Sequence, residues 1–301
     1  MAATSETVPP IGLIGGTGLY AITECLENIR TVEVDTPYGK PSGPFTLGDL
    51  KGCSPARPVI FLPRHGPGHK FSPSEVPYAA NIWAMKSLGV RTVISFSAVG
   101  SLREEHKPAD IVMPLQFIDR TKARDPATFF RGIGVVAHVS FADPICPELA
   151  AAVYGAVETL ADPPVKATLG GTYVCIEGPA FSTRAESNIY RSWGADVVGM
   201  TNLTEAKYAR EAEIAYCTVA LVTDYDCWKV DEDPVTADAV IAIMKKNSAN
   251  AVRIIERAVR VVDPAADWPA HHALAGAVSL ENISEEAKEK LGPIAAPYLK
   301  K

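Results

Sequence analysis

Two aspartates, Asp224 and Asp226, flank a tyrosine directly after an apolar segment, residues 214–222. In an extended chain, side chains two positions apart lie on the same face. Two carboxylates on one face can accept hydrogen bonds from the amino group and a ring nitrogen of a heterocyclic base. Burial and like-charge repulsion can also keep one of them protonated at neutral pH. The alternative is a turn or helix cap, where aspartate is common.

A second set of small and polar residues follows other apolar segments. "GGTG" contains Thr17, "PRHG" contains Arg64 and His65, and two further segments end at Ser97 and Thr201. Ligands of α/β proteins bind where strands give way to loops. Main-chain amides, hydroxyls and a guanidinium that grips phosphate bidentately would together form an anion site. Taken singly, each segment is equally consistent with a tight turn, a surface arginine or close strand packing.

The glycine spacing argues against two other nucleotide sites. Gly12, Gly15, Gly16 and Gly18 do not fit the GxGxxG register, and no Gly-Lys-Ser/Thr follows them. A dinucleotide oxidoreductase and a phosphate-loop enzyme are therefore disfavoured. No cluster with the spacing of metal ligands lies near these segments, so no metal and no cofactor are expected.

The elements that would carry these residues alternate between strand and helix. We expect strands at 11–15, 58–63, 90–100, 110–119, 172–179, 195–202 and 214–226. We expect helices at 76–89, 147–161, 182–194 (capped by Ser182 or Thr183), 205–212 and 235–262. This alternation predicts an α/β fold with a central mixed β-sheet flanked by helices. The sequence predicts one domain over residues 10–301, preceded by a short, mobile N-terminal extension (1–9). The charged C-terminal tail is either a docked helix or a frayed end.

The composition limits the partners. The chain has 301 residues, of which 47% are hydrophobic and 21% charged, with a net charge of −6, which argues against nucleic acid as a partner. We expect no secretory signal, because the start "MAATSETVPP" lacks a basic and an apolar region, and no membrane span, because no apolar run is long enough. Its six cysteines form no CxxC pair, so we expect free thiols in a reducing compartment. The expected location is the cytoplasm, with the nucleus as a second location.

Many ordered blocks between residues 10 and 262 resemble the S-methyl-5'-thioadenosine phosphorylases, a branch of the trimeric purine nucleoside phosphorylases. The blocks include "IGLIGGTGLY", "PRHG", "IEGPAFSTRAES", "WGADVVGMTN" and "VTDYDCWK". The resemblance implies a single-domain purine nucleoside phosphorylase-like fold and a homotrimer. It also implies a reaction in purine and methionine salvage. Inorganic phosphate, as co-substrate, cleaves S-methyl-5'-thioadenosine to adenine and 5-methylthioribose 1-phosphate.

The resemblance also assigns roles to residues. The implied phosphate ligands are Thr17, Arg64, His65, Ser97, Ala98 and Thr201. Met200 would lie against the ribose, and the base would meet Phe181, Ser182, Asp224 and Asp226. The methylthio group would meet Ala237, Val240 and Ile241, with His138 contributed by a neighbouring subunit. The implied catalytic residues are Asp224, Arg64 and His65.

The residues also bear on the choice of substrate. A 6-amino group donates hydrogen bonds and suits a carboxylate at position 224, whereas a 6-oxo group would set acceptor against acceptor. Ser97, Ala237 and "MTNLTEA" depart from the family pattern, and a few residues are missing between Arg124 and His138, which leaves the range of 5' substituents open. The alternatives are a purine nucleoside phosphorylase acting on adenosine, inosine or guanosine, and a nucleotide-binding regulator without catalysis.

Overall fold

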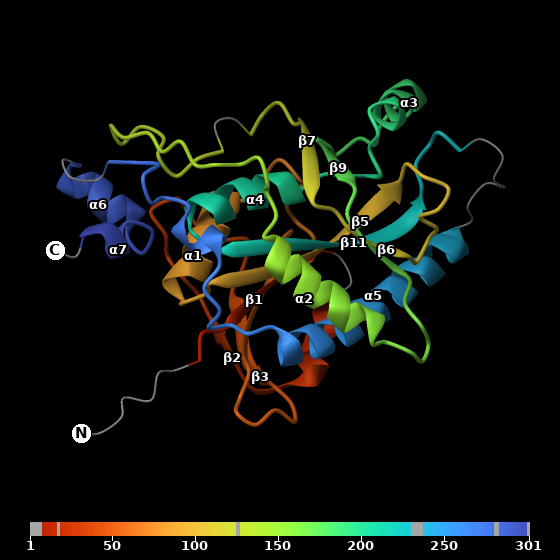
Figure 1. Cartoon of the computed structure of the whole chain (residues 1–301), viewed down its shortest axis with the longest axis horizontal. Helices are drawn as coiled ribbons and strands as arrows, with labels where there is room; N and C mark the ends of the chain where they lie inside the picture. The colour runs from red at the N-terminus through yellow and green to blue at the C-terminus, as the bar shows by residue number, and fades with distance from the viewer. Residues whose placement is uncertain (1–7, 17–18, 125–126, 230–236, 280–282, 300–301) are drawn as a thin grey trace.

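A computed structural model describes residues 8–16, 19–124, 127–229, 237–279 and 283–299 of the chain. Its strands form one eleven-stranded mixed sheet (Figure 1). Their bounds are β1 Ile11–Gly15, β2 Leu26–Val32, β3 Phe45–Leu50, β4 Pro58–Pro63, β5 Thr92–Ser101, β6 Ile111–Met113, β7 Gln116–Arg120, β8 Ala167–Leu169, β9 Thr172–Ile176, β10 Val197–Gly199 and β11 Ala215–Tyr225.

Parallel strands in the order β4-β1-β5-β11 form the centre of the sheet. Their side chains are buried almost throughout, as in IGLIG of β1 and PVIFLP of β4. Strands covered on both faces read as continuous apolar runs, which is why these segments were recognisable. Antiparallel β2 and β3 extend one side, while β10, β9 and β7 extend the other.

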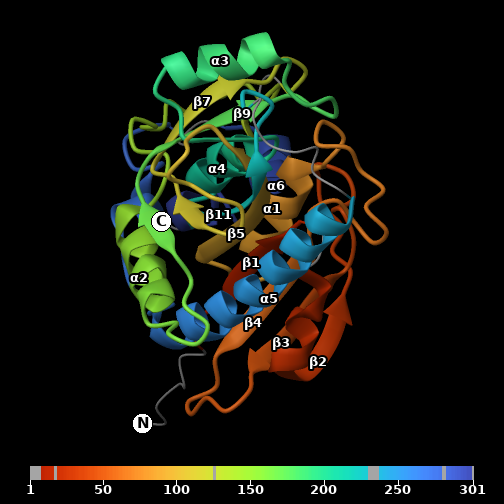
Figure 2. The same cartoon turned by 90° about the vertical axis from the view of Figure 1, so that its right-hand side faces the viewer.

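Helices cover both faces of this sheet. Figures 1 and 2 show α2 (Pro147–Glu158) and α5 (Ala237–Val261) on one face, and α1 (Tyr78–Ser87) and α4 (Asn202–Glu211) on the other. The remaining helical elements are α3 Arg184–Ser192, α6 Glu285–Leu291, α7 Ala296–Leu299 and the 3₁₀ helices η1 Leu19–Cys25 and η2 Pro269–His272.

The C-terminal tail is docked rather than frayed. The Trp83 indole in α1 donates to the Leu291 carbonyl at 3.1 Å, and the Tyr298 hydroxyl donates to Glu213 at 2.5 Å. All six cysteines are free thiols, as expected. No helix in the described part of the chain is long and apolar enough to cross a membrane.

The structure confirms the mixed α/β fold and corrects some elements. The segment 110–119 was predicted as one strand, but it forms β6 and β7 separated by Pro114 and Leu115, because β6 pairs with β8 and β11 whereas β7 pairs with β9. Strands β2, β3 and β8 were not predicted. Thr183 is the cap of α3 and forms a capping box with Glu186. The mobility predicted for the extension concerns residues that lie mostly outside the described ranges.

Candidate active site

Strands β1 and β4 end side by side at one edge of the sheet, and the parallel strand β5 passes beyond them. Gly15 pairs with Pro63, and the next residue, Arg64, donates its amide to the Gly15 carbonyl at 2.9 Å. Pairing of β1 with β5 stops at Ser95. Strand β5 continues past that point, so Ser97 and Ala98 face the space above the end of β1. Gly16, the "PRHG" segment and the "SAVG" segment therefore meet because their strands run in the same direction.

The fourth segment arrives from the opposite direction. Strand β10 is antiparallel to β5, with Val198 opposite Gly100, so the chain after β10 runs back toward Ser97. Thr201 is the N-cap residue of α4, is 4% exposed, and makes no side-chain capping bond. A helix N-terminus attracts anions because its first N–H groups lack partners within the helix. Thr201 thus stands at the positive end of a ten-residue helix, and its hydroxyl is not used to cap that helix.

These segments enclose a cavity of about 210 Å³. Its lining contains six of the predicted site residues: Arg64, His65, Ser97, Ala98, Met200 and Thr201. The rest of the lining is Gly16, His69, Pro73, Val99, Gly100, Val198, Gly199 and Thr223. The buried Ser97 hydroxyl has no hydrogen-bond partner among the described residues. A buried polar atom without a partner is costly, so this hydroxyl marks a place for a polar ligand.

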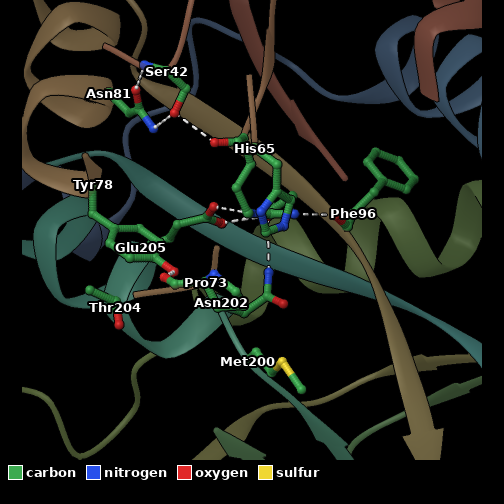
Figure 3. A network of polar contacts seen from close by, with 12 residues as sticks. Ser42, His65, Pro73, Tyr78, Asn81, Phe96, Met200, Asn202, Thr204 and Glu205 are labelled. Carbon is green, nitrogen blue, oxygen red and sulfur yellow. Dashed lines mark hydrogen bonds and ion pairs between the residues drawn. The ribbon is translucent and has the colours of Figure 1, made fainter. Parts of the chain in front are cut away.

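Arg64 is held in a buried ion pair beside the cavity. The residue is 1% exposed. Its Nε and Nη2 atoms donate to the two carboxylate oxygens of Glu205. Glu205 also accepts from Ser95 Oγ at 2.6 Å and from the Tyr216 hydroxyl at 2.8 Å. Asn202 Nδ2 donates to Ser95 Oγ and to the Tyr216 hydroxyl. We call Arg64, Glu205, Ser95, Asn202 and Tyr216 the Arg64 network. Figure 3 shows Glu205 and Asn202 of this network, with Phe96 beside them.

This network corrects the expectation that Arg64 grips phosphate bidentately. A guanidinium has five N–H donors. Two bond Glu205, one bonds Ser95 Oγ and one bonds the Phe96 carbonyl. The remaining donor is on Nη1, and a methyl group placed on Gly16 would lie 3.6 Å from that atom. Among the described residues, Arg64 therefore has one donor left for the cavity, because its fork is already bound to a carboxylate.

His65 lines the same cavity as a neutral imidazole. Its Nδ1 lies 2.8 Å from the Phe71 carbonyl, which can only accept, so Nδ1 carries the proton. Its ring stacks on His69 with 4.2 Å between centroids. Burial, and then the adjacent Arg64 charge, lower the pKa of His65 to about 4. At neutral pH, Nε2 is therefore an acceptor, able to take a hydrogen bond from a hydroxyl or from a protonated phosphate oxygen.

The two aspartates lie at the edge of the cavity. Asp224 is opposite Gly100 in the register of β11 with β5, after a register shift at Thr223, and Thr223 Oγ1 donates to Asp224 Oδ1 at 2.5 Å. Asp226 donates its amide to the Ser101 carbonyl at 2.9 Å. The Asp226 side chain packs against Gly100, and its Oδ2 is buried without a hydrogen-bond partner among the described residues. Thr223 and Gly100 line the anion cavity, and they also contact Asp224 and Asp226, respectively. The cavity and the carboxyl pair therefore adjoin at these two residues.

Ser182 is brought to the same side. Cys227, which follows Asp226, donates its thiol to the Ser182 carbonyl at 3.2 Å, and Arg184 Nε donates to the Cys227 carbonyl at 3.2 Å. The Ser182 hydroxyl, like Asp226 Oδ2, is buried without a partner in the described part of the chain.

Other predicted residues lie elsewhere. Phe181 is 85% exposed and does not line the cavity, because the loop between β9 and α3 leaves its ring on the surface of this chain. His138 lines a different cavity of about 550 Å³, together with residues of the 140–148 and 269–277 segments. Thr17 lies outside the described residues. Ala237, Val240 and Ile241 belong to α5, but their side chains lie outside the described part of the structure.

Sequence reasoning missed three residues that shape the site: Glu205, Glu177 and Arg124. Glu205 stands in the "MTNLTEA" block and Glu177 in "IEGPAF", but the patterns around them indicated only a helix and a turn. A glutamate in a predicted helix that is otherwise buried is the one signal that could have identified Glu205, since buried carboxylates require a partner. In the described residues, no group of three or more His, Cys, Asp or Glu side chains could hold a metal ion.

This combination of a mixed sheet, an anion cavity at its strand ends and a carboxyl pair at the rim matches a known class. A family model described as "Phosphorylase superfamily" matches residues 10–260. The chain is 53% identical over 293 residues to S-methyl-5'-thioadenosine phosphorylase of Geobacter sulfurreducens, covering 96% of this chain and 99% of that protein. Its identity to the Koribacter versatilis protein of the same name is 51%, covering 96% of each chain.

Two solved structures that this chain resembles are also methylthioadenosine phosphorylases. A methylthioadenosine phosphorylase from an antarctic soil metagenomic library matches with a TM-score of 0.89 and 50% identity, covering 95% of this chain and 99% of that one. A mutant adenosine/methylthioadenosine phosphorylase of Schistosoma mansoni, in complex with methylthioadenosine, matches at a TM-score of 0.80 and 33% identity, covering 90% and 99%. The chain belongs to the phosphorylase superfamily and, within it, to the S-methyl-5'-thioadenosine phosphorylase family.

Proposed function

We propose that this protein cleaves S-methyl-5'-thioadenosine with inorganic phosphate, releasing adenine and 5-methylthioribose 1-phosphate. The observation that carries the proposal is the shared boundary between the anion cavity and the carboxyl pair. The helix N-terminus at Thr201, the unpartnered Ser97 hydroxyl and the single Arg64 donor suit a phosphate. The two aspartates, on the other side of Thr223 and Gly100, suit a base. A ribose would then span the distance between the phosphate in the cavity and the base at the aspartates.

In the proposed step, a phosphate oxygen forms a bond to the ribosyl C1' carbon as the C1'–N9 bond breaks, and that electron pair passes to the adenine. The proton lost from hydrogen phosphate balances the proton gained by the base. Asp224, in its neutral form, would deliver a proton to N7, which makes the base a better leaving group. Phosphate needs only to be positioned, and its charge stabilises the cationic ribosyl group. We propose no metal and no cofactor beyond this co-substrate.

We propose that Asp224 and Asp226 select a 6-aminopurine. The unpartnered Asp226 Oδ2 and Ser182 Oγ are both buried, and an adenine edge could supply hydrogen bonds to them. Phe181, on the adjoining loop, would cover the base only once substrate or a second copy of the chain packs against it.

The 5' end of the nucleoside would point toward α5. A smaller cavity of about 20 Å³ shares Gly16, Ser97, Ala98 and Thr223 with the larger one and is closed by Met244, Asn247 and Ser248 of that helix. Ala237, Val240 and Ile241 precede them on the same helix, and their proposed contact with the methylthio group remains a prediction.

We also propose a homotrimer. His138 does not line the phosphate cavity of its own chain, so any role there requires a second copy. Light scattering after gel filtration tests the trimer. Mixing two inactive variants, one at His138 and one at Asp224, would regain activity only if subunits share sites. We propose a cytoplasmic location, while the nuclear location stays a prediction that no observation supports.

A second candidate is activity on adenosine as well. The Schistosoma mansoni relative is named for both nucleosides and shares 33% identity with this chain. Product release from methylthioadenosine, adenosine and inosine, each with and without phosphate, separates the candidates. Phosphate-dependent adenine release with little hypoxanthine release is expected. Efficient inosine cleavage would contradict the base assignment, and no phosphate-dependent release from any nucleoside would favour the non-catalytic regulator.

A further inference from the structure

Arg124 lies just outside the cavity and contacts one residue of its lining, Met200, together with Glu177 and Tyr78, which do not line it. Its side chain is 4% exposed. Nη1 donates to the Met200 carbonyl at 2.5 Å, Nη2 donates to the Glu177 carbonyl at 2.7 Å, and Nε donates to Glu177 Oε1 at 3.1 Å. Figure 3 shows Tyr78, Pro73, Thr204 and Met200 in this region. Neither Arg124 nor Glu177 lines the cavity.

The Met200 contact bears directly on the anion site. The Met200 carbonyl and the Thr201 amide belong to one planar peptide group. A hydrogen bond that holds the carbonyl therefore holds the plane, and with it the start of Thr201, whose hydroxyl stands at the N-terminus of α4. On its other side, the Met200 side chain lies against Gly178, where a methyl group would come within 2.6 Å of the sulfur atom. Met200 and Thr201 are thus confined from two directions.

The same group of residues holds the opposite wall. The Tyr78 hydroxyl donates to the Pro73 carbonyl at 2.7 Å and lies 3.3 Å from Arg124 Nη1. Ser74, next to Pro73, donates its hydroxyl to the Glu177 carboxylate, which also accepts the Lys122 and Ala123 amides. Pro73 and Met200 both line the cavity. Arg124, Glu177 and Tyr78, which we call the rim brace, therefore connect its two walls.

The electrostatics agree with a fixed, charged brace. Although burial alone would raise the pKa of Glu177, the hydrogen bonds from Ser74, Lys122 and Ala123, and then the Arg124 charge, lower it to about 2. The carboxylate is therefore ionised at neutral pH. The Arg124 charge is neutralised by its partner, so its effect on phosphate would come from geometry and not from long-range attraction.

We propose that Arg124 is a positioning residue for phosphate: with Glu177 and Tyr78, it sets the Met200–Thr201 peptide and the Pro73 wall at the separation that the bound anion requires. The inference rests on the proposed function, because it assigns phosphate to this cavity. It predicts that disturbing the rim brace weakens the binding of phosphate more than the binding of the nucleoside.

The test compares Arg124→Lys with Arg260→Lys. Lysine keeps the charge but cannot reach two carbonyls and a carboxylate at once. Arg260, in α5, likewise donates to two loop carbonyls, those of Gly52 at 3.1 Å and Lys51 at 2.8 Å, but neither residue lines the cavity. Arg260→Lys therefore controls for the loss of a loop-bridging arginine.

We expect Arg124→Lys to raise the KM for phosphate about tenfold or more while changing the KM for methylthioadenosine by less than about threefold, since displacing a binding group by about 1 Å has effects of this size or larger. Arg260→Lys should change neither. A phosphate KM within about twofold of wild type, or an equal rise in both KM values, would overturn the inference. If Arg124→Lys does not fold, Glu177→Gln carries the same comparison.

Different results would refute the proposed function and the role of Arg124. A wild-type protein without phosphate-dependent cleavage would refute the proposed function. Phosphate binding could still be followed as a rise in Tm with phosphate concentration. In that assay, loss of the rise in Arg124→Lys but not in Arg260→Lys would support the brace, and an equal rise in both variants would refute it.

Discussion

The buried Arg64–Glu205 ion pair predicts a large loss of stability when its carboxylate is removed. Arg64 is 1% exposed, and the side chain of Glu205 is 3% exposed. Burial by itself would lower the pKa of Arg64, but the Glu205 carboxylate outweighs it and raises that pKa. The arginine therefore stays charged. Glu205→Gln leaves this charge inside the protein without a counter-charge. Removing one partner of a buried ion pair costs about 3–5 kcal/mol.

That cost converts to a measurable shift. For a chain of this length, each kcal/mol corresponds to about 2 °C in Tm, so Glu205→Gln should unfold about 6–10 °C below wild type. The assay is thermal unfolding followed by circular dichroism in phosphate-free buffer at pH 7. Tyr216→Phe removes one hydrogen bond to the same carboxylate and should cost about 1.5–3 kcal/mol, which keeps the test usable if the first variant does not fold.

Glu211→Gln is the matched control. Glu211 is also buried, at the last position of α4, and it accepts from Thr128 Oγ1 and the Phe129 amide, each at 2.7 Å. Both of these donors are neutral groups, so the loss of the carboxylate should cost only about 1–2 kcal/mol. The reasoning is refuted if Glu205→Gln unfolds within about 2 °C of wild type, or no lower than Glu211→Gln.

Three further outcomes are expected. Asp224→Asn should lower kcat/KM for methylthioadenosine by about 10²–10⁴ and improve inosine relative to adenosine, and unchanged kinetics would remove Asp224 from proton transfer. The His65 imidazole should titrate near pH 4 in NMR spectra and at higher pH with phosphate bound, because an anion favours the charged ring. An unaltered His65 titration in the presence of phosphate would show that this residue does not contact the anion. Because folding lowers the pKa of Glu177 from 4.5 to about 2, its stabilisation is complete above about pH 4.5 and is lost as the pH falls toward 2. The difference in unfolding free energy between wild type and Glu177→Gln, from urea titrations, should shrink over that range, and a constant difference would contradict this origin.

Local patterns in the sequence determined the elements whose signal is local. The buried strands β1 and β4 were predicted with their observed bounds, because strands covered on both faces carry continuous apolar runs. The helix α5 followed from apolar residues at helical spacing. Edge strands gave no such signal. In β2, Leu26 is buried but the next five residues are exposed, and only pairing with β3, the next strand along the chain, makes the segment a strand.

For the site, the sequence by itself determined which residue types stand at the strand ends. The resemblance of the family blocks then predicted the role of each residue. Tertiary structure decided which of their hydrogen-bonding groups remain available. Arg64 and Glu205 are 141 positions apart, and Arg124 and Met200 are 76 apart. No periodicity relates such pairs, since short-range patterns report only the local backbone. The path of β10 and α4 across the end of β5 leaves Arg64 one free donor and gives Arg124 its contacts around the cavity.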